Sequence, residues 1–429
     1  MKYLIKGGRV IDPANNIDEK LDVLVEDGII ASVGKSVKAA GAEVINAAGK
    51  VVTPGLIDMH VHLREPGQEA KEDFVTGTKA AAAGGFTRIA TMPNTKPVVD
   101  TAAAVRSLQK RAEDVAVVHV EIIGALTKGQ NGAELAEVGD MTLAGAVAFS
   151  DDGHYVEKAK VLLNGFDYLR TFDKIIINHD EEKSLVEDGV MNEGHRSAML
   201  GMKGRPTVAE DIAVARDIML AEYADAKVHV AHISSARAVD IVRQAKKRGV
   251  KVTAEATPQH LTLTDECVNL IDTSTKINPP LRSAKDIEAV LEGVKDGTID
   301  MIVTDHSPHA EEEKDVEYIY APSGFPGLET SLGVLLTDLY HTGKLDLPLI
   351  ISKMTAEPAK VFGLEAGTLS KGAKADITLI DPELEWTVDA KEFYTKGTHS
   401  PFVGKKMKGK AVMTMVDGVI VMQDGKVTD

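Results

Sequence analysis

Two histidines separated by one residue, His60 and His62, follow an apolar run that begins near Val51. In an extended strand, residues two apart face the same side, so both imidazoles point in one direction. Imidazole nitrogens are common ligands of divalent metal ions such as Zn²⁺. A single His-x-His is weak evidence when taken alone. The pair therefore raises a metal-binding hypothesis that needs support elsewhere in the chain.

The same arrangement recurs at four later points, where an apolar run ends in a side chain that can bind a metal: Asp152, His179, His232 and Asp305. Taken singly, Asp152 or Asp305 could be a helix N-cap, because Asp often follows the strand of a βα unit. Helix capping does not explain four histidines and two aspartates at the ends of five strands. This set of ligands, without thiolates, predicts a pair of divalent ions, with Zn²⁺ the leading choice and Mn²⁺ or Co²⁺ as substitutes.

These ligands need a scaffold that brings the ends of several strands together. From about Pro54 to Phe362, apolar strand candidates alternate with alanine-rich helical stretches, which is typical of βα units around a parallel sheet. The strand candidates lie near Leu56–His62, Thr87–Met92, Val117–Ile123, Ala146–Ser150, Ile175–Asn178, Val228–Ala231, Val252–Ala256 and Met301–Thr304. Eight such units predict an α/β fold, a (β/α)8 TIM barrel with its active site at the C-terminal ends of the strands. An open doubly wound sheet is the alternative, although no glycine-rich phosphate loop follows the first strand.

The two ends of the chain have a different pattern. Short β-rich runs, separated by glycine-containing turns, lie near both termini: Tyr3–Ile5, Leu21–Val25, Ile29–Val33, Asp376–Ile380, Val412–Val416 and Val419–Met422. The last two runs predict a hairpin around Asp417-Gly418. We therefore predict a small β-sandwich domain built from both chain termini, residues 1–53 and 363–429, beside a barrel of residues 54–362.

Composition narrows the classes of function. The formal net charge of −16 over 429 residues argues against binding to nucleic acid or to an anionic membrane surface. The single cysteine, Cys267, excludes a disulfide framework. No apolar run approaches the roughly 20 residues that a membrane-spanning helix needs, so we expect a soluble cytoplasmic protein. An anionic small-molecule substrate would need a local electropositive site.

Longer motifs resemble a known family. Residues Pro54–His62 resemble the signature of cyclic amidohydrolases in the urease-related superfamily, and Leu63–Gly67 resembles its continuation in dihydroorotases. Further resemblance extends over nearly the whole chain, at Gly84–Thr87, Met92–Thr95, Ser150–Gly153, Asn278–Arg282, Asp305–His309 and Gly327–Thr330. The resemblance implies a reversible cyclisation of N-carbamoyl-L-aspartate to L-dihydroorotate in pyrimidine biosynthesis.

The resemblance also implies a division of labour among the metal ligands. His60 and His62 resemble the ligands of one metal, and His179 and His232 those of the other. Asp305 resembles the catalytic aspartate that contacts the first metal and carries a proton. Many relatives bridge the two metals with a carboxylated lysine at the end of strand four. This chain has Asp152 there, as in a bacterial class that uses a carboxylate bridge, and Lys158 and Lys160 follow later.

A second set of residues is predicted to bind the substrate. Arg64 offers a planar guanidinium for a carboxylate, with a surface salt bridge as its alternative role. Asn94 offers a donor and an acceptor, with a turn after Pro93 as its alternative. The resemblance adds these substrate contacts: His62, Asn278, His309, Ser323 and Gly324. His306 is expected to be solvated or structural, and the loop Asp305–Lys314 is either a mobile flap over the substrate or an ordinary solvated loop.

The predicted mechanism is attack on the ring carbonyl by a hydroxide that bridges the two metals, with Asp305 as the proton shuttle. A hydantoinase or allantoinase is the nearest alternative, disfavoured by Arg64 and by the missing strand-four lysine. A non-catalytic partner of aspartate transcarbamoylase is the other alternative, disfavoured because every expected ligand is present. The resemblance favours a homodimer. Association with aspartate transcarbamoylase, the native metal and the occupancy of the second site stay open.

Overall fold

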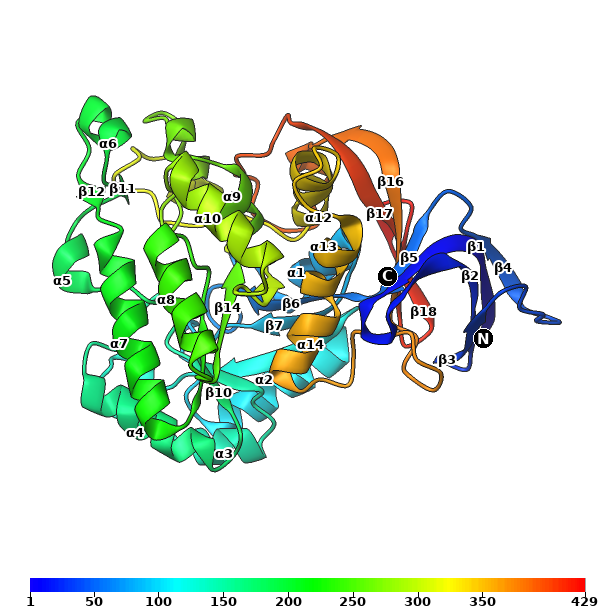
Figure 1. Cartoon of the computed structure of the whole chain (residues 1–429), viewed down its shortest axis with the longest axis horizontal. Coiled ribbons are helices and arrows are strands. Elements are labelled where there is room, and N and C mark those ends of the chain that lie inside the picture. Colours follow the sequence, from blue (N-terminus) through cyan, green and yellow to red (C-terminus); the bar gives the residue numbers. More distant parts are fainter. Residues whose placement is uncertain (429) are drawn as a thin grey trace.

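The computed structural model describes residues 1–428, and two sheets organise it (Figure 1). The first is an eight-stranded parallel sheet whose strands follow each other in chain order. Its strands are β6 (Leu56–Val61), β7 (Phe86–Thr91), β8 (His119–Gly124), β9 (Ala148–Ser150), β10 (Ile175–Asn178), β13 (Lys227–Val230), β14 (Val252–Ala256) and β15 (Met301–Ile302). All eight predicted strands are therefore present.

The parallel sheet closes almost completely on itself. Val61 at the end of β6 forms a parallel bridge with His306, which follows β15, and the His62 amide donates to the His306 carbonyl at 2.8 Å. The sequential strand order excludes a doubly wound sheet, in which the order reverses at a switch point. The predicted (β/α)8 barrel is thus confirmed.

Helices cover the outside of the barrel. The main ones are α1 (Phe74–Gly84), α2 (Ala102–Val115), α3 (Val138–Leu143), α4 (Ala159–Arg170), α7 (Val208–Ala224), α8 (Ala236–Lys247), α10 (Ala284–Lys295) and α13 (Leu347–Met354). Shorter helices are α5 (Lys183–Val186), α6 (His195–Leu200), α9 (Pro258–Thr262), α11 (Glu311–Lys314), α12 (Ser331–Leu335) and α14 (Ala356–Phe362). No helix in residues 1–428 is long and apolar enough to cross a membrane.

Helix α8 shows how the local sequence specifies these elements. Ser235 caps its N-terminus, with its hydroxyl accepting a hydrogen bond from the Ala238 amide at 2.9 Å. The buried side chains Ala238, Val239, Val242 and Ala245 repeat at helical spacing and face the barrel. Other helices around the barrel also bury an apolar face against the strands. These faces hold the strands in place and leave the strand ends free.

The second sheet joins both ends of the chain. It contains β1 (Lys2–Asp12), β2 (Ile17–Glu26), β3 (Ile29–Gly34), β4 (Glu43–Asn46), β5 (Val51–Pro54), β16 (Ile377–Thr387), β17 (Lys406–Val416), β18 (Val419–Gln423) and β19 (Lys426–Val427). Strand β5 pairs antiparallel with β16, and parallel with β1, so the N-terminal and C-terminal segments form one mixed sheet. The predicted hairpin of β17 and β18 is present, with Val416 opposite Val419. Residue 429, in the predicted C-terminal segment, lies outside the described residues, and the predicted domain limits stay a prediction.

The terminal sheet is attached to the N-terminal ends of the barrel strands, away from the predicted ligands. The Thr378 hydroxyl donates to the Gly85 carbonyl at 2.6 Å, and His119 at the start of β8 lies 3.4 Å from Asp376 and 3.5 Å from Asp417. Asp376 and Asp417 border strands of the terminal sheet, so these polar contacts connect the two parts of the molecule. The small sheet therefore supports the barrel without contributing a predicted metal ligand.

Candidate metal centre and substrate pocket

The six predicted metal ligands converge where the barrel strands end. His60 lies near the end of β6, and the others follow their strands by one to three residues. The Nε2 atom of His60 lies 3.4 Å from Asp152 Oδ1 and 3.6 Å from Asp305 Oδ1. The Nε2 atom of His62 lies 3.2 Å from Asp305 Oδ1 and 3.4 Å from Asp152 Oδ2. His232 Nε2 lies 3.6 Å from Asp152 Oδ1.

Within residues 1–428, three groups of three side chains have ligand atoms within 4.8 Å of one another, and two of them belong to this cluster: His60, His62 and Asp305, and His60, Asp152 and His232. The third group, His119, Asp376 and Asp417, lies at the junction with the terminal sheet. The sixth predicted ligand, His179, is in none of these groups. Its Nδ1 atom lies 2.9 Å from His232 Nε2 and 3.7 Å from Asp152 Oδ1. The arrangement is consistent with a binuclear metal site in which the Asp152 carboxylate lies between two pairs of histidines.

Three buried atoms of this cluster indicate that a cation belongs there. His60 Nε2, Asp152 Oδ1 and His232 Nδ1 are buried and have no hydrogen-bond partner. Buried polar groups without partners are costly and rare. The nitrogen-to-oxygen separations are longer than good hydrogen bonds, and they suit ligands arranged around an ion with bonds of about 2.0–2.2 Å. The residues present therefore fit a metal ion.

Neighbouring side chains orient two of the histidines. His60 Nδ1 donates to Glu255 Oε1 at 2.5 Å, which leaves the Nε2 lone pair free for a metal. Glu255 also contacts His229 Nε2 at 3.0 Å. His62 Nδ1 donates to Asn94 Oδ1 at 2.9 Å, with the same consequence for its Nε2. Each ring is thus held in the tautomer that metal binding requires.

The two aspartates of the cluster are held in their anionic form. Burial acts to raise the pKa of Asp152, but contacts with His60, His179 and His232 hold the pKa well below its ordinary value. Burial likewise opposes ionisation of Asp305, and its close contacts with His62, His60 and His232 lower its pKa. Both carboxylates are therefore available as anionic ligands at neutral pH.

Three site residues have backbone conformations that L-residues seldom adopt. The φ angles of Arg64, His232 and Asp305 are +62°, +31° and +51°. Residues held in this left-handed region store strain of roughly 1–3 kcal/mol each and are common at functional sites. The turns after β6, β13 and β15 thus aim these side chains at the pocket despite a conformational cost.

All of the predicted substrate contacts line one pocket of about 200 Å³ at the metal cluster. Its wall includes five of the six predicted metal ligands, and His60 lies beneath them, fully buried. The predicted substrate residues in the wall are His62, Arg64, Asn94, Asn278, His309, Ser323 and Gly324. The volume suits a small molecule of the size of a single heterocyclic ring.

Arg64 is buried beside the pocket, which excludes a surface salt bridge as its role. Its Nε donates to the Pro308 carbonyl at 3.2 Å, and its Nη2 lies 3.5 Å from His309 Nε2. Burial lowers the pKa of Arg64 to about 10, so it remains a cation at neutral pH. A buried cation in the pocket wall is the local electropositive feature that an acidic chain needs to bind an anion.

The two asparagines lie on opposite sides of the cluster. Besides accepting from His62, Asn94 donates through Nδ2 to the Asp152 carbonyl at 3.4 Å, so it is more than a turn residue. Asn278 Nδ2 lies 2.9 Å from His179 Nε2, and its Oδ1 is buried without a hydrogen-bond partner. An unsatisfied acceptor in the pocket wall is suited to a donor group of a ligand.

The loop after β15 is packed against the pocket. His309 is 8% exposed, and its Nε2 contacts the Ser323 carbonyl at 2.9 Å, so a solvated position for this histidine is excluded. His306 is fully buried, and its Nδ1 accepts from the Gly327 amide at 3.1 Å. Of the two roles expected for His306, solvated or structural, the structure therefore supports the structural one.

Sequence reasoning missed three buried acids that support the site: Asp58, Glu72 and Glu255. Asp58 accepts from the His60 amide at 3.0 Å and from the Thr304 amide at 3.1 Å, which joins the first and last strands of the barrel. Glu72 lies 3.3 Å from His306. For Asp58 and Glu255 the available signal was an acid within a buried strand, because such an acid needs a buried partner. Glu72 lies in the loop before α1, where the sequence offered no such signal.

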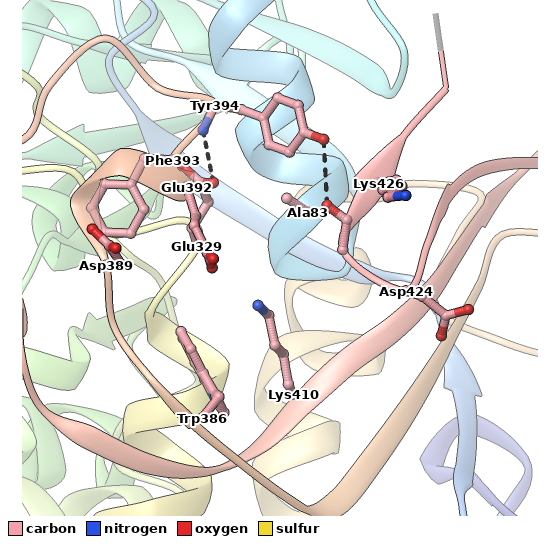
Figure 2. Close-up of a pocket in the computed structure, with 11 residues that line it drawn as sticks. Ala83, Glu329, Trp386, Asp389, Glu392, Phe393, Tyr394, Lys410, Asp424 and Lys426 are labelled. Atoms are coloured by element: carbon pink, nitrogen blue, oxygen red, sulfur yellow. Dashed lines mark hydrogen bonds between the residues drawn. The ribbon is translucent and has the colours of Figure 1, made fainter.

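A larger pocket of about 290 Å³ lies where the end of α1, the segment before α12, the segment after β16 and the terminal sheet meet (Figure 2). Trp386, Lys410 and Glu329 face it, and Lys410 Nζ lies 4.4 Å from the centre of the Trp386 indole. None of its lining residues is a histidine. It lacks the ligand set and the unpartnered atoms of the first pocket, so the smaller pocket is the one that fits a metal ion.

Comparison with known proteins agrees with this geometry. Residues 49–238 match the family model described as dihydro-orotase-like, and residues 205–421 match the amidohydrolase family. The chain is 55% identical to a dihydroorotase of Pelotomaculum thermopropionicum, over 99% of both chains. It is 52% identical to a dihydroorotase of Geobacter sp. strain M21, over 99% of this chain and 100% of the other.

Solved structures show the same fold. An L-hydantoinase (dihydropyrimidinase) from Arthrobacter aurescens has a TM-score of 0.90 at 29% identity, with 100% of this chain and 97% of that one covered. A D-hydantoinase (dihydropyrimidinase) from Thermus sp. has a TM-score of 0.83 at 26% identity, with 99% and 96% covered. The full-length sequence identity, the barrel and its His/Asp centre agree, and the chain belongs to the dihydroorotase family of metal-dependent enzymes within the amidohydrolase superfamily.

Proposed function

We propose that this enzyme interconverts N-carbamoyl-L-aspartate and L-dihydroorotate in de novo pyrimidine biosynthesis. The observation that carries the proposal is that a candidate His/Asp metal cluster and the buried cation Arg64 line the same small pocket. The hydrolytic direction adds water across the ring amide, breaks its carbon–nitrogen bond and releases a carboxylate. This chemistry needs an activated water, an anion-binding group and a group that moves one proton.

We propose that Asp152 takes the place of the carboxylated lysine found in many relatives. Its Oδ1 atom lies within 3.7 Å of His60, His179 and His232, and its Oδ2 atom lies 3.4 Å from His62. The two lysines that follow, Lys158 and Lys160, are exposed and do not line the pocket. The carboxylate between the histidine pairs supports a bridging role for Asp152.

The cluster would hold the metals through His60, His62, Asp152, His179, His232 and Asp305, with Zn²⁺ the leading choice. A bound divalent ion lowers the pKa of water and polarises the ring carbonyl, which supplies a nucleophile at neutral pH. Asp305 stands beside His62 at the pocket wall, where its carboxylate can take the proton of the attacking water. The same carboxyl would then deliver that proton to the departing ring nitrogen.

The remaining groups of the wall would orient the substrate. Arg64 would bind a carboxylate through its guanidinium, and the Asn278 Oδ1 atom would accept from an N–H of the ureido group. His309, Ser323 and Gly324 complete the wall beside Arg64 and would exclude water from the reacting bond. Holding both reactive ends of carbamoyl-aspartate in one pocket lowers the entropic barrier to ring closure.

A direct assay tests this proposal. Purified protein is offered L-dihydroorotate, hydantoin and allantoin before chelation, after chelation, and after Zn²⁺ is restored. We expect turnover of dihydroorotate alone, lost on chelation and recovered with zinc, and at least 1,000-fold slower in Asp305→Ala, on the order of a missing proton-transfer group. Hydrolysis of hydantoin or allantoin in preference to dihydroorotate would show that the enzyme is a hydantoinase or an allantoinase.

The two directions of the reaction should respond differently to pH. Asp305 must begin as the carboxylate for hydrolysis and as the acid for ring closure. Because the pKa of Asp305 is lowered, the carboxylate already predominates at pH 5.5, so ring closure should accelerate as pH falls and hydrolysis should not. Initial rates measured in both directions from pH 5.5 to 9 check this, and parallel trends would remove Asp305 from the shuttle role.

The sequence pattern supports a cytoplasmic location as a further proposal. The resemblance supports a homodimer, and it leaves an association with aspartate transcarbamoylase open to test. The high negative charge makes nucleic acid and anionic membranes unsuitable partners. Light scattering of the purified protein, alone and mixed with the transcarbamoylase, measures both assembly proposals. A monomer that elutes apart from the transcarbamoylase contradicts them.

A further inference from the structure

Two buried lysines lie behind the pocket wall without a carboxylate to pair with. Lys314 is 2% exposed and Lys276 is 5% exposed. Neither ammonium forms an ion pair within residues 1–428, and each donates only to backbone carbonyls. Lysines are seldom buried without a counter-ion, so their positions require a cause.

Both ammonium groups bind backbone carbonyls of one segment, Tyr318–Gly324, which we call the wall segment. Lys314 Nζ donates to the carbonyls of Pro322 and Gly324, each at 2.9 Å. Lys276 Nζ donates to the carbonyls of Tyr318 and Ile319 at 2.7 and 2.9 Å. These four hydrogen bonds fix both ends of a segment that has no helix or strand of its own.

The wall segment is part of the pocket that holds the substrate in the proposed function. Ser323 and Gly324 line the pocket, and the Ser323 carbonyl contacts His309. The Gly324 amide also donates to the Lys276 carbonyl at 2.8 Å. A movement of either lysine therefore moves the wall directly.

The charge of Lys314 reaches the pocket as well. Burial, Arg64 and Lys314 together lower the pKa of His309 to about 3, so the field of the buried lysine acts on a pocket residue. The other charged groups near Lys314 are Lys276, Asp272 and Glu313, and none of the carboxylates is within ion-pair distance of its Nζ. A positive charge without a neutralising partner attracts an anionic ligand more strongly than a paired one does.

We infer that Lys314 and Lys276 are positioning residues, which hold the wall segment against the substrate and supply positive charge behind an anionic ligand. The inference rests on the proposed function for the identity of that ligand. Carbamoyl-aspartate carries two carboxylates and dihydroorotate carries one. The loss of a positive charge should consequently weaken the binding of carbamoyl-aspartate more than that of dihydroorotate.

Burial, together with the nearby cation Lys276, lowers the pKa of Lys314 to about 7. Burial, together with the nearby cation Arg205, lowers the pKa of Lys276 to about 8. Each lysine is charged below its pKa and neutral above it. As pH rises through 7 to 8, the positive charge behind the pocket disappears. The KM for carbamoyl-aspartate should rise over this interval in the wild type, and the rise should be smaller in a variant without Lys314.

The test compares Lys314→Met, which removes the charge and the hydrogen bonds, with Lys314→Gln, which removes the charge and keeps a donor. Lys353→Met is the matched control, because Lys353 is also buried and donates to a single carbonyl, that of Ile299 at 2.6 Å, away from the pocket. At pH 6.5 we expect Lys314→Met to raise the KM for carbamoyl-aspartate about tenfold and that for dihydroorotate about threefold. Lys314→Gln should raise the first KM more than the second, and the control should change neither beyond twofold.

Hydrogen exchange measured by mass spectrometry tests the positioning role without turnover. Backbone amides of residues 318–324 should exchange at least tenfold faster in Lys314→Met than in the wild type, and at the wild-type rate in Lys353→Met. Unchanged exchange, or equal KM increases for both substrates in Lys314→Met, would overturn the inference. If the wild type has no dihydroorotase turnover while exchange responds as expected, the proposed function fails and the positioning role stands.

Discussion

Glu255 offers the sharpest test of how this metal centre is assembled. It is fully buried beneath the cluster, where it accepts from His60 Nδ1 at 2.5 Å and from the His232 amide at 3.2 Å, and its second oxygen lies 3.0 Å from His229 Nε2. Burial alone would raise the pKa of Glu255, but His60 and His229 hold it well below its ordinary value. Glu255 is therefore an anion wherever the enzyme is folded and active.

Replacement of this residue, Glu255→Gln, keeps the shape and removes the charge. The amide oxygen can still accept from His60. Its NH₂ group would then face His229 Nε2, which can become an acceptor if His229 Nδ1 donates to the Thr253 hydroxyl, 2.7 Å away. The change therefore turns charge-assisted hydrogen bonds, worth about 1.5–3 kcal/mol, into neutral ones worth about 0.5–1.5 kcal/mol.

The difference, about 1–1.5 kcal/mol, corresponds to roughly a tenfold loss of metal affinity. This lies at the lower end of the 10–100-fold range typical of residues that orient metal ligands. Zinc affinity is measured by competition with a chromogenic chelator, and dihydroorotate hydrolysis is measured at limiting and saturating zinc. We expect activity to be low at limiting zinc and to recover to within a few-fold of the wild type at saturation.

Asp12→Asn is the matched control, because Asp12 is also a fully buried carboxylate but lies in the terminal sheet, where it accepts from the Leu369 amide at 2.8 Å. Thermal unfolding of the metal-free proteins verifies that both variants fold. A zinc affinity within twofold of the wild type in Glu255→Gln, or an equal loss in Asp12→Asn, would refute the reasoning that Glu255 sets the tautomer and basicity of His60.

Three further predictions concern binding, stability and metal loading. Arg64→Lys should raise the KM for carbamoyl-aspartate at least tenfold, because an ammonium cannot reproduce a guanidinium that contacts His309 and lines the pocket. A KM within twofold of the wild-type value would contradict this prediction. Burial raises the pKa of Glu329 to about 8, so its neutral form stabilises the fold at low pH and this stabilisation is lost as pH rises toward 8. The free energy of unfolding in urea should hence fall between pH 5 and 8 more steeply in the wild type than in Glu329→Gln, and equal slopes would exclude the assignment. Chelation should lower the Tm measured by calorimetry, and zinc should restore it, because His60 Nε2 and Asp152 Oδ1 lose their partner; an unchanged Tm would show that the site is empty in the purified protein.

The strands and their ligands could be predicted from the sequence because both signals are local. An apolar run that ends in His or Asp is visible within about ten residues, and its repetition at His179 and His232 indicated the barrel and the site together. The motif from His60 to Gly67 indicated the family in the same way. Parallel strands then bring their C-terminal ends to one face, whatever the sequence between them.

The supporting residues could not be predicted, because their partners are distant in the chain. Glu255 orients His60 from 195 residues away, and Asp58 joins the first strand to the last across 246 residues. The residues near either acid in the sequence do not identify the partner that it contacts. Only closure of the barrel decides which buried donor each carboxylate meets.

Lys314 shows the same limit most clearly. It ends the run Glu311-Glu312-Glu313-Lys314, a polar pattern that locally indicates a solvated loop. The sequence by itself determined an α/β barrel, a cluster of His and Asp at the strand ends, and the family, because these depend on strand periodicity and on motifs of contiguous residues. The tertiary structure alone decided that Lys314 is buried, because the carbonyls of Pro322 and Gly324 fold back over its ammonium and take the place of water.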